Sequence, residues 1–118
     1  MSEIISKDLL SEVLNIKSRF ETDILNIKID GNFIFYKLDR KVKPSKRINI
    51  YELAHKCIIY AWDKMYDISP SVMGTKIVCL KTGFELYIVQ REEIENPKPF
   101  DPRFTFKALQ WLLDNKGI

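Results

Sequence analysis

The chain has 118 residues, of which 46% are hydrophobic and 30% charged, with a net charge of +3. This composition is typical of a globular protein and too apolar for a disordered one, and the length predicts a single domain over residues 1–118. No apolar run approaches the ~18 residues that a membrane span needs, and the first residues lack the pattern of a signal peptide. We therefore expect a cytoplasmic protein without a membrane partner.

The first predicted elements are a helix and a β-hairpin. Ser6 can cap a helix from Lys7 to Phe20, where apolar residues recur at helical spacing. Alternation of apolar and polar residues from Leu25 to Asp30 predicts a half-buried strand. Asp30, Gly31 and Asn32 then suit a tight turn, centred on either Asp30-Gly31 or Gly31-Asn32, into a second strand that ends near Leu38.

The two faces of this hairpin are expected to differ. Phe33 and Phe35 should project on one face, beside Lys28 and Lys37. The other face should carry the aliphatic residues and one tyrosine: Leu25, Ile27, Ile29, Ile34, Tyr36 and Leu38.

A capping box formed by Asn49 and Glu52 predicts the start of a central helix that extends as far as Tyr66. Apolar residues occupy two neighbouring stripes of this helix, so we expect it to pack on two sides or against a partner. The first stripe consists of Ile50, Leu53, Ala54, Cys57, Ile58, Ala61 and Met65. The second consists of Tyr51, His55, Ile59, Trp62 and Tyr66.

A loop over 67–74 should precede a second hairpin, from Thr75 to Gln90, that turns at Thr82 and Gly83. Both faces of this hairpin are apolar, which predicts a position inside the sheet with at least partial cover on both sides. One face should carry Ile77, Cys79, Leu86 and Ile88, and the other Val78, Leu80, Tyr87 and Val89.

A proline-rich connector leads to the last helix, which Asp101 should cap, with Pro102 at its first position and Gly117 at its end. We expect the phenylalanines of the segment 96–106 to pack onto their own domain. The alternative is that they seat a neighbouring subunit, as in a homo-oligomer, or another partner.

The order helix, hairpin, helix, hairpin, helix predicts an α+β fold. Two hairpins between helices indicate one mostly antiparallel four-stranded sheet with helices packed on one face.

Few residues suggest catalysis or metal binding. His55 is the one histidine, and the alternative to a binding protein is a small enzyme with His55 as general base, assisted by Tyr51 or Asp63 in a pocket that Tyr51 and Trp62 line. Cys57 and Cys79 are expected to be buried thiols, because two cysteines and one histidine make an incomplete zinc site. We expect no metal site and no cofactor.

The excess positive charge lies in one segment, residues 37–47, which we call the basic connector. It holds six Lys or Arg residues and one Asp, so the rest of the chain is net negative. This pattern predicts a small binding or adaptor domain that docks an anionic partner, either an acidic protein surface or nucleic acid. A solvated loop without a partner is the simpler alternative. The predicted binding residues are Lys28, Phe33, Phe35, Lys37, Arg40, Lys41, Lys43, Lys46 and Arg47.

Overall fold

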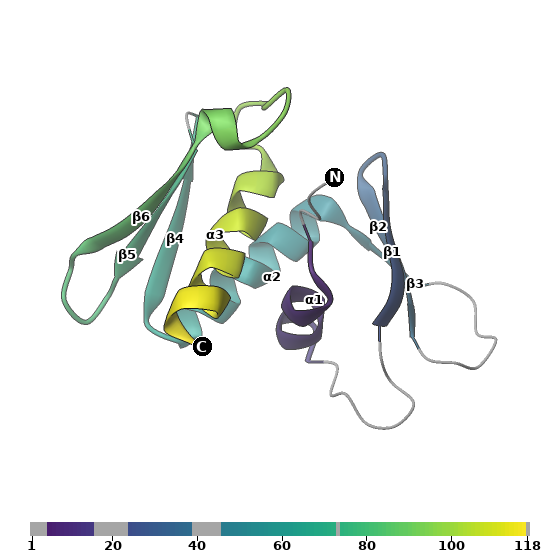
Figure 1. Cartoon of the computed structure of the whole chain (residues 1–118), viewed down its shortest axis with the longest axis horizontal. Coiled ribbons are helices and arrows are strands. Elements are labelled where there is room, and N and C mark those ends of the chain that lie inside the picture. The colour runs from purple at the N-terminus through teal and green to yellow at the C-terminus, as the bar shows by residue number, and fades with distance from the viewer. Residues whose placement is uncertain (1–4, 16–23, 39–45, 73, 118) are drawn as a thin grey trace.

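The computed structural model describes residues 5–15, 24–38, 46–72 and 74–117. In this part of the chain it is an α+β protein with three α-helices, one 3-10 turn and six strands (Figure 1). The elements are α1 (Lys7–Val13), β1 (Ile24–Asp30), β2 (Phe33–Leu38), β3 (Lys46–Asn49), α2 (Ile50–Asp63), β4 (Tyr66–Ser71), β5 (Gly74–Cys79), β6 (Glu85–Gln90), η1 (Arg91–Glu93) and α3 (Pro102–Lys116).

The strands form two separate antiparallel sheets, sheet A in the order β1-β2-β3 and sheet B in the order β4-β5-β6. The molecule measures 45 × 31 × 22 Å, and the sheets lie toward opposite ends of its long axis with the helices between them (Figure 1). Each sheet is a three-strand meander followed by a helix, so the βββα unit occurs twice.

The predicted single four-stranded sheet is therefore wrong. Each hairpin is extended by a strand from a segment that was expected to be irregular: β3 comes from the end of the basic connector, and β4 from the expected loop 67–74. Since α2 runs directly between β3 and β4, the two hairpins are held apart by the length of a helix and do not pair.

The predicted helix caps are confirmed. Ser6, Asn49 and Asp101 each accept a hydrogen bond from a backbone N–H in the first turn of the helix that follows. The first helix, however, ends at Val13, and Asn15 adopts a left-handed φ of 55°. The expected continuation toward Phe20 fails at that point, and residues 16–20 lie outside the described part of the chain.

The first hairpin has the expected turn but an irregular register. Ile29 lies opposite Ile34 across the turn at Gly31 and Asn32, which matches the predicted faces. A bulge between Leu25 and Lys28 then shifts the register, so that Leu25 is paired with Lys37 rather than with an apolar position.

The second hairpin departs further from the expected register. Its strands end at Cys79 and restart at Glu85, and Ile77 lies opposite Tyr87. Ile77 and Val89 are both fully buried, whereas Ile88 is 41% exposed. The predicted division of faces is therefore wrong, because a shift of one residue exchanges the two faces of a strand. Cover of the second face is partial, since Val78 and Leu86 are half-buried while Ile88 is exposed.

Helices α2 and α3 pack against each other and fill the space between the sheets. Most of the first stripe is buried, but Ile58 is only partly buried, and Met65 lies beyond the end of α2 and is 42% exposed. Tyr51, His55, Ile59 and Trp62 of the second stripe are exposed, so the described residues cover α2 on one side only. Phe104 and Phe106 of α3 are buried as expected, while Phe100 is exposed. The Trp111 ring of α3 stacks on Tyr87 of sheet B at 5.1 Å between centroids. None of the helices in the described ranges is long and apolar enough to cross a membrane.

Gly74 is expected to be essential for the pairing of β5 with β6. Its φ is +148°, and a Cβ at this position would overlap the carbonyl oxygen of Val89. Gly74→Ala should lower the free energy of unfolding by about 3 kcal/mol. Gly83→Ala is the matched control, because that glycine has open space around it and should cost only about 1 kcal/mol. Equal losses of unfolding free energy for the two variants, measured by urea unfolding, would contradict this role of Gly74.

Candidate functional site

The outer face of sheet A carries two phenylalanine rings surrounded by basic side chains. The Phe33 and Phe35 centroids lie 6.4 Å apart with their planes tilted by 48°. The guanidinium carbon of Arg47 lies 4.8 Å from the centroid of Phe33, which is cation–π geometry. Across the strands, Phe35 lies opposite Lys28 of β1 on one side and Arg47 of β3 on the other.

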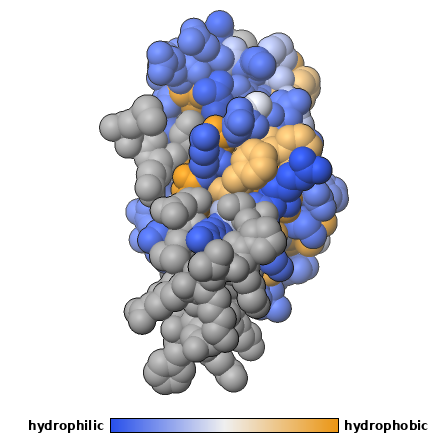
Figure 2. Space-filling view, turned by 90° about the vertical axis from the view of Figure 1, so that its right-hand side faces the viewer, coloured by the Kyte–Doolittle hydropathy of each residue, from blue (hydrophilic) through white to orange (hydrophobic). Residues whose placement is uncertain are grey.

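Burial of the inner face explains why these side chains point outward. Ile34 and Tyr36 of β2 and Ile48 of β3 are buried in the core. Because neighbouring residues on a strand point to opposite faces, Phe33, Phe35 and Arg47 must then project on the outer side. Figure 2 shows this end of the molecule, with a small hydrophobic patch set among hydrophilic side chains.

A hydrogen bond joins the tip of the first hairpin to the central helix. The backbone N–H of Ile50 donates to the carbonyl oxygen of Asn32 at 2.8 Å. Since β3 leads straight into α2, this bond and the β2–β3 pairing together fix Arg47 relative to the phenylalanine rings.

The other predicted binding residues are placed differently. Lys37 is half-buried and lies on the side of Phe35, whereas Lys46 is exposed but lies opposite Tyr36, which belongs to the inner face. Arg40, Lys41 and Lys43 lie outside the described residues. The structure thus brings together Lys28, Phe33, Phe35 and Arg47.

One carboxylate on this face was missed in the sequence. Asp30 is exposed and lies opposite Phe33, one strand position beyond Lys28 on the same face. Alternation of side chains along β1 predicts this position for Asp30 from the sequence alone. Asp30 lowers the net positive charge at the hairpin tip. The excess positive charge of this face therefore lies near Lys28 and Arg47.

The residues proposed for the alternative enzyme do not enclose a site. His55 and Asp63 are exposed on α2, and Trp62 is 55% exposed. Tyr51 lines a cleft at the start of α2, but His55 does not line it. Among the described residues, no group of three or more His, Cys, Asp or Glu could hold a metal ion.

The two cysteines are free thiols in different surroundings. Cys57 is fully buried, and its burial raises its pKa to about 12. Cys79 is only partly buried, which differs from the expectation, and a hydrogen bond with the Thr82 side chain lowers its pKa.

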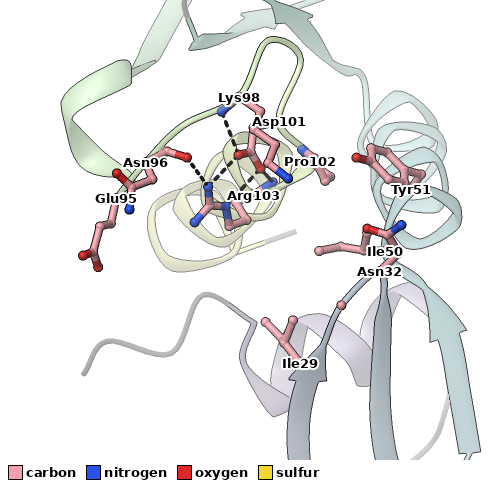
Figure 3. A pocket seen from close by; sticks show the side chains of 11 residues that line it. Ile29, Asn32, Ile50, Tyr51, Glu95, Asn96, Lys98, Asp101, Pro102 and Arg103 are labelled. Atoms are coloured by element: carbon pink, nitrogen blue, oxygen red, sulfur yellow. Dashed lines mark hydrogen bonds and ion pairs between the residues drawn. The ribbon is translucent and has the colours of Figure 1, made fainter.

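A cleft with a volume of about 540 Å³ lies between the hairpin tip of sheet A, the start of α2 and the segment 95–103 (Figure 3). Sequence reasoning did not identify it, because its walls come from three distant segments. Two residues of the segment 95–103 have left-handed φ values: Asn96, which lines the cleft, at 50°, and Phe100, which does not line it, at 55°.

An ion pair between the buried Asp101 and the partly exposed Arg103 holds this wall in place. Asp101 accepts two hydrogen bonds from the Arg103 side chain, at 2.6 and 3.0 Å, and one from the backbone N–H of Lys98 at 3.1 Å. Arg103 also donates to the carbonyl oxygen of Asn96 at 3.1 Å. Burial acts to raise the pKa of Asp101, but the hydrogen bonds from Arg103 and Lys98 outweigh it, so the pKa is lowered. The Asp101 carboxylate and the Arg103 guanidinium neutralise each other. We therefore assign this network a structural role, in which it holds the segment 95–103 in place along the cleft.

Comparisons with protein-family models, with curated proteins and with solved structures found no significant match for this chain.

Asp101 should make the protein sensitive to acid. The pKa of Asp101 is lower in the folded chain than in the unfolded chain. Its contribution to the free energy of unfolding is therefore complete above the unfolded-state pKa and is lost as the pH falls through the folded-state pKa. Asp101→Asn keeps a capping oxygen but removes the charge, so we expect a loss of about 2 kcal/mol at pH 7 that shrinks on acidification. Urea unfolding from pH 7 to pH 3 measures this difference, and a loss that does not change with pH would contradict the assignment.

Proposed function

We propose that this chain is a non-catalytic binding or adaptor domain that docks an anionic partner on the outer face of sheet A and the adjoining basic connector. The observation that carries the proposal is the placement of Phe35 between Lys28 and Arg47, with Arg47 stacked on Phe33.

The cations of this face are available to a partner. Lys28 and Arg47 form no ion pair with another described residue, and both are exposed. The cation–π contact with Phe33 favours one orientation of the Arg47 guanidinium, which would reduce the side-chain entropy lost on meeting a phosphate or carboxylate.

Two classes of partner fit this chemistry, and they use the phenylalanine rings differently. A single-stranded nucleic acid would place phosphates on the basic side chains and stack bases on Phe33 and Phe35, as on other aromatic sheet faces. An acidic protein surface would use the same cations for steering and would need the rings only as apolar contact.

Charge reversal tests the proposal. Lys28→Glu with Arg47→Glu should weaken binding of a labelled 20-nucleotide poly-dT strand or of poly-glutamate by at least about tenfold at moderate salt. The control is Lys56→Glu with Lys81→Glu, which makes the same change in net charge at exposed positions of α2 and the β5–β6 turn. Fluorescence anisotropy measures both. Equal binding by the two double variants, or no binding of either probe by the unmodified chain, would refute the proposal.

Leucine substitution then separates the two partner classes. Phe33→Leu with Phe35→Leu removes the aromatic faces but keeps apolar side chains on the strand. Loss of poly-dT binding with poly-glutamate binding retained indicates a nucleic acid, because base stacking contributes roughly 1–3 kcal/mol per base. Unchanged binding of both probes indicates an acidic protein partner.

A further inference from the structure

The cleft beside the hairpin tip of sheet A leaves apolar side chains uncovered. Ile29 belongs to the inner face of sheet A, opposite the fully buried Ile34, yet it is 41% exposed where it lines the cleft. Tyr51 lines the cleft from the first turn of α2 and is 53% exposed. Pro102, the first residue of α3, lines it from the side opposite Ile29 (Figure 3). A cleft of about 540 Å³ with such a surface has the size of sites that hold small organic molecules.

The cleft also carries hydrogen-bond donors that the described residues leave unused. Nη1 of Arg103 has two N–H groups without a described partner, because the side-chain bonds of Arg103 come from Nε and Nη2. The Nζ of Lys98 and the hydroxyl of Tyr51 likewise form no hydrogen bond or ion pair within the described part of the chain. In Figure 3 the Tyr51 hydroxyl points across the cleft toward the start of α3.

The negative groups of the cleft do not match these donors. Each oxygen of the Asp101 carboxylate already accepts two hydrogen bonds, from the backbone of Lys98 and from the backbone and side chain of Arg103. Among the described lining residues, the other carboxylate is Glu95, and in Figure 3 it points away from the other labelled side chains. A ligand would therefore have to supply acceptors, and guanidinium and ammonium groups bind carboxylates and phosphates most strongly.

We propose that this cleft binds a small organic anion. Its carboxylate or phosphate contacts Lys98 and Arg103, and its flat apolar body packs on Ile29 and Tyr51. The site is separate from the candidate binding face, because Ile29 belongs to the inner face of sheet A and Phe33 to the outer face. The proposal therefore does not depend on the proposed function.

The wall that carries the two cations supports an anion rather than a neutral ligand. Two hydrogen bonds to Asp101 and one to the carbonyl oxygen of Asn96 orient the Arg103 guanidinium, which would reduce the side-chain entropy lost on binding. Both α2 and α3 begin at the cleft, so the positive ends of their dipoles lie there. Their first turns are capped by Asn49 and Asp101, so side chains rather than helix backbones would hold the anion.

Binding of defined probes provides the first test. NMR spectra of the nitrogen-15-labelled full chain at pH 7 are recorded during titration with 2-naphthyl phosphate or 2-naphthoate. We expect saturable shifts of the Gly31 and Tyr51 amides, with a dissociation constant of roughly 1 mM or below for at least one probe. The neutral 2-naphthol should bind at least about tenfold more weakly, because it lacks the anionic group. The stronger of the two anionic probes identifies the ligand as a phosphate or as a carboxylate.

Substitutions at the cleft provide the second test. Ile29→Trp should fill the cleft and weaken binding of the stronger probe by at least about tenfold. Ile88→Trp is the matched control, because Ile88 is also a strand residue that is 41% exposed but does not line the cleft. Lys98→Gln keeps the backbone N–H that bonds to Asp101, so the wall should stay intact while binding weakens by roughly fivefold. Lys116→Gln, at the end of α3, should leave binding unchanged.

Three results would each overturn the proposal. They are the absence of saturable shifts up to about 10 mM of either anionic probe, equal affinities for 2-naphthol and the anionic probes, and equal binding by the two tryptophan variants. The double variant Lys28→Glu with Arg47→Glu separates this site from the outer face of sheet A. It should bind the stronger probe within about twofold of the unmodified chain even where it no longer binds poly-dT or poly-glutamate.

Discussion

The arrangement of this protein depends on the burial of one stripe of α2. Leu53, Cys57 and Ala61 are fully buried on the side of the helix that faces the core. Asn49, the last residue of β3, caps α2, and β4 begins soon after α2 ends, so the helix joins the two sheets with little intervening chain. Any change that turned α2 about its axis would shift both sheets together.

This connection explains why the candidate binding face lies at one end of the molecule. Among the described elements, the helices cover only the inner side of sheet A and leave its outer face open (Figure 1). The hydrogen bond from Ile50 to Asn32 fixes the hairpin tip against the start of α2. The basic and aromatic face is therefore built on paired strands, which fix its geometry.

The second βββα unit is completed by a polar network rather than by apolar packing alone. Asp101 caps α3 and binds Arg103, and Arg103 reaches back to the carbonyl of Asn96. These bonds hold a turn that contains two left-handed residues, Asn96 and Phe100, and so direct α3 across sheet B. Ser6 also donates to Gln110 at 2.5 Å, which links the first helix to the last.

Local signals in the sequence determined the helix starts, the first hairpin turn and the association of Lys28 with Phe35, because each depends on residues close together in the chain or on strand alternation. The third strand of each sheet, the bulges and the shifted register of β6 were decided by tertiary structure. Pairing of β3 with β2 and of β4 with β5 satisfies backbone groups that carry no side-chain pattern of their own. The same holds for Arg47 over Phe33: the sequence showed both residues, but only the β2–β3 pairing placed the guanidinium on the ring.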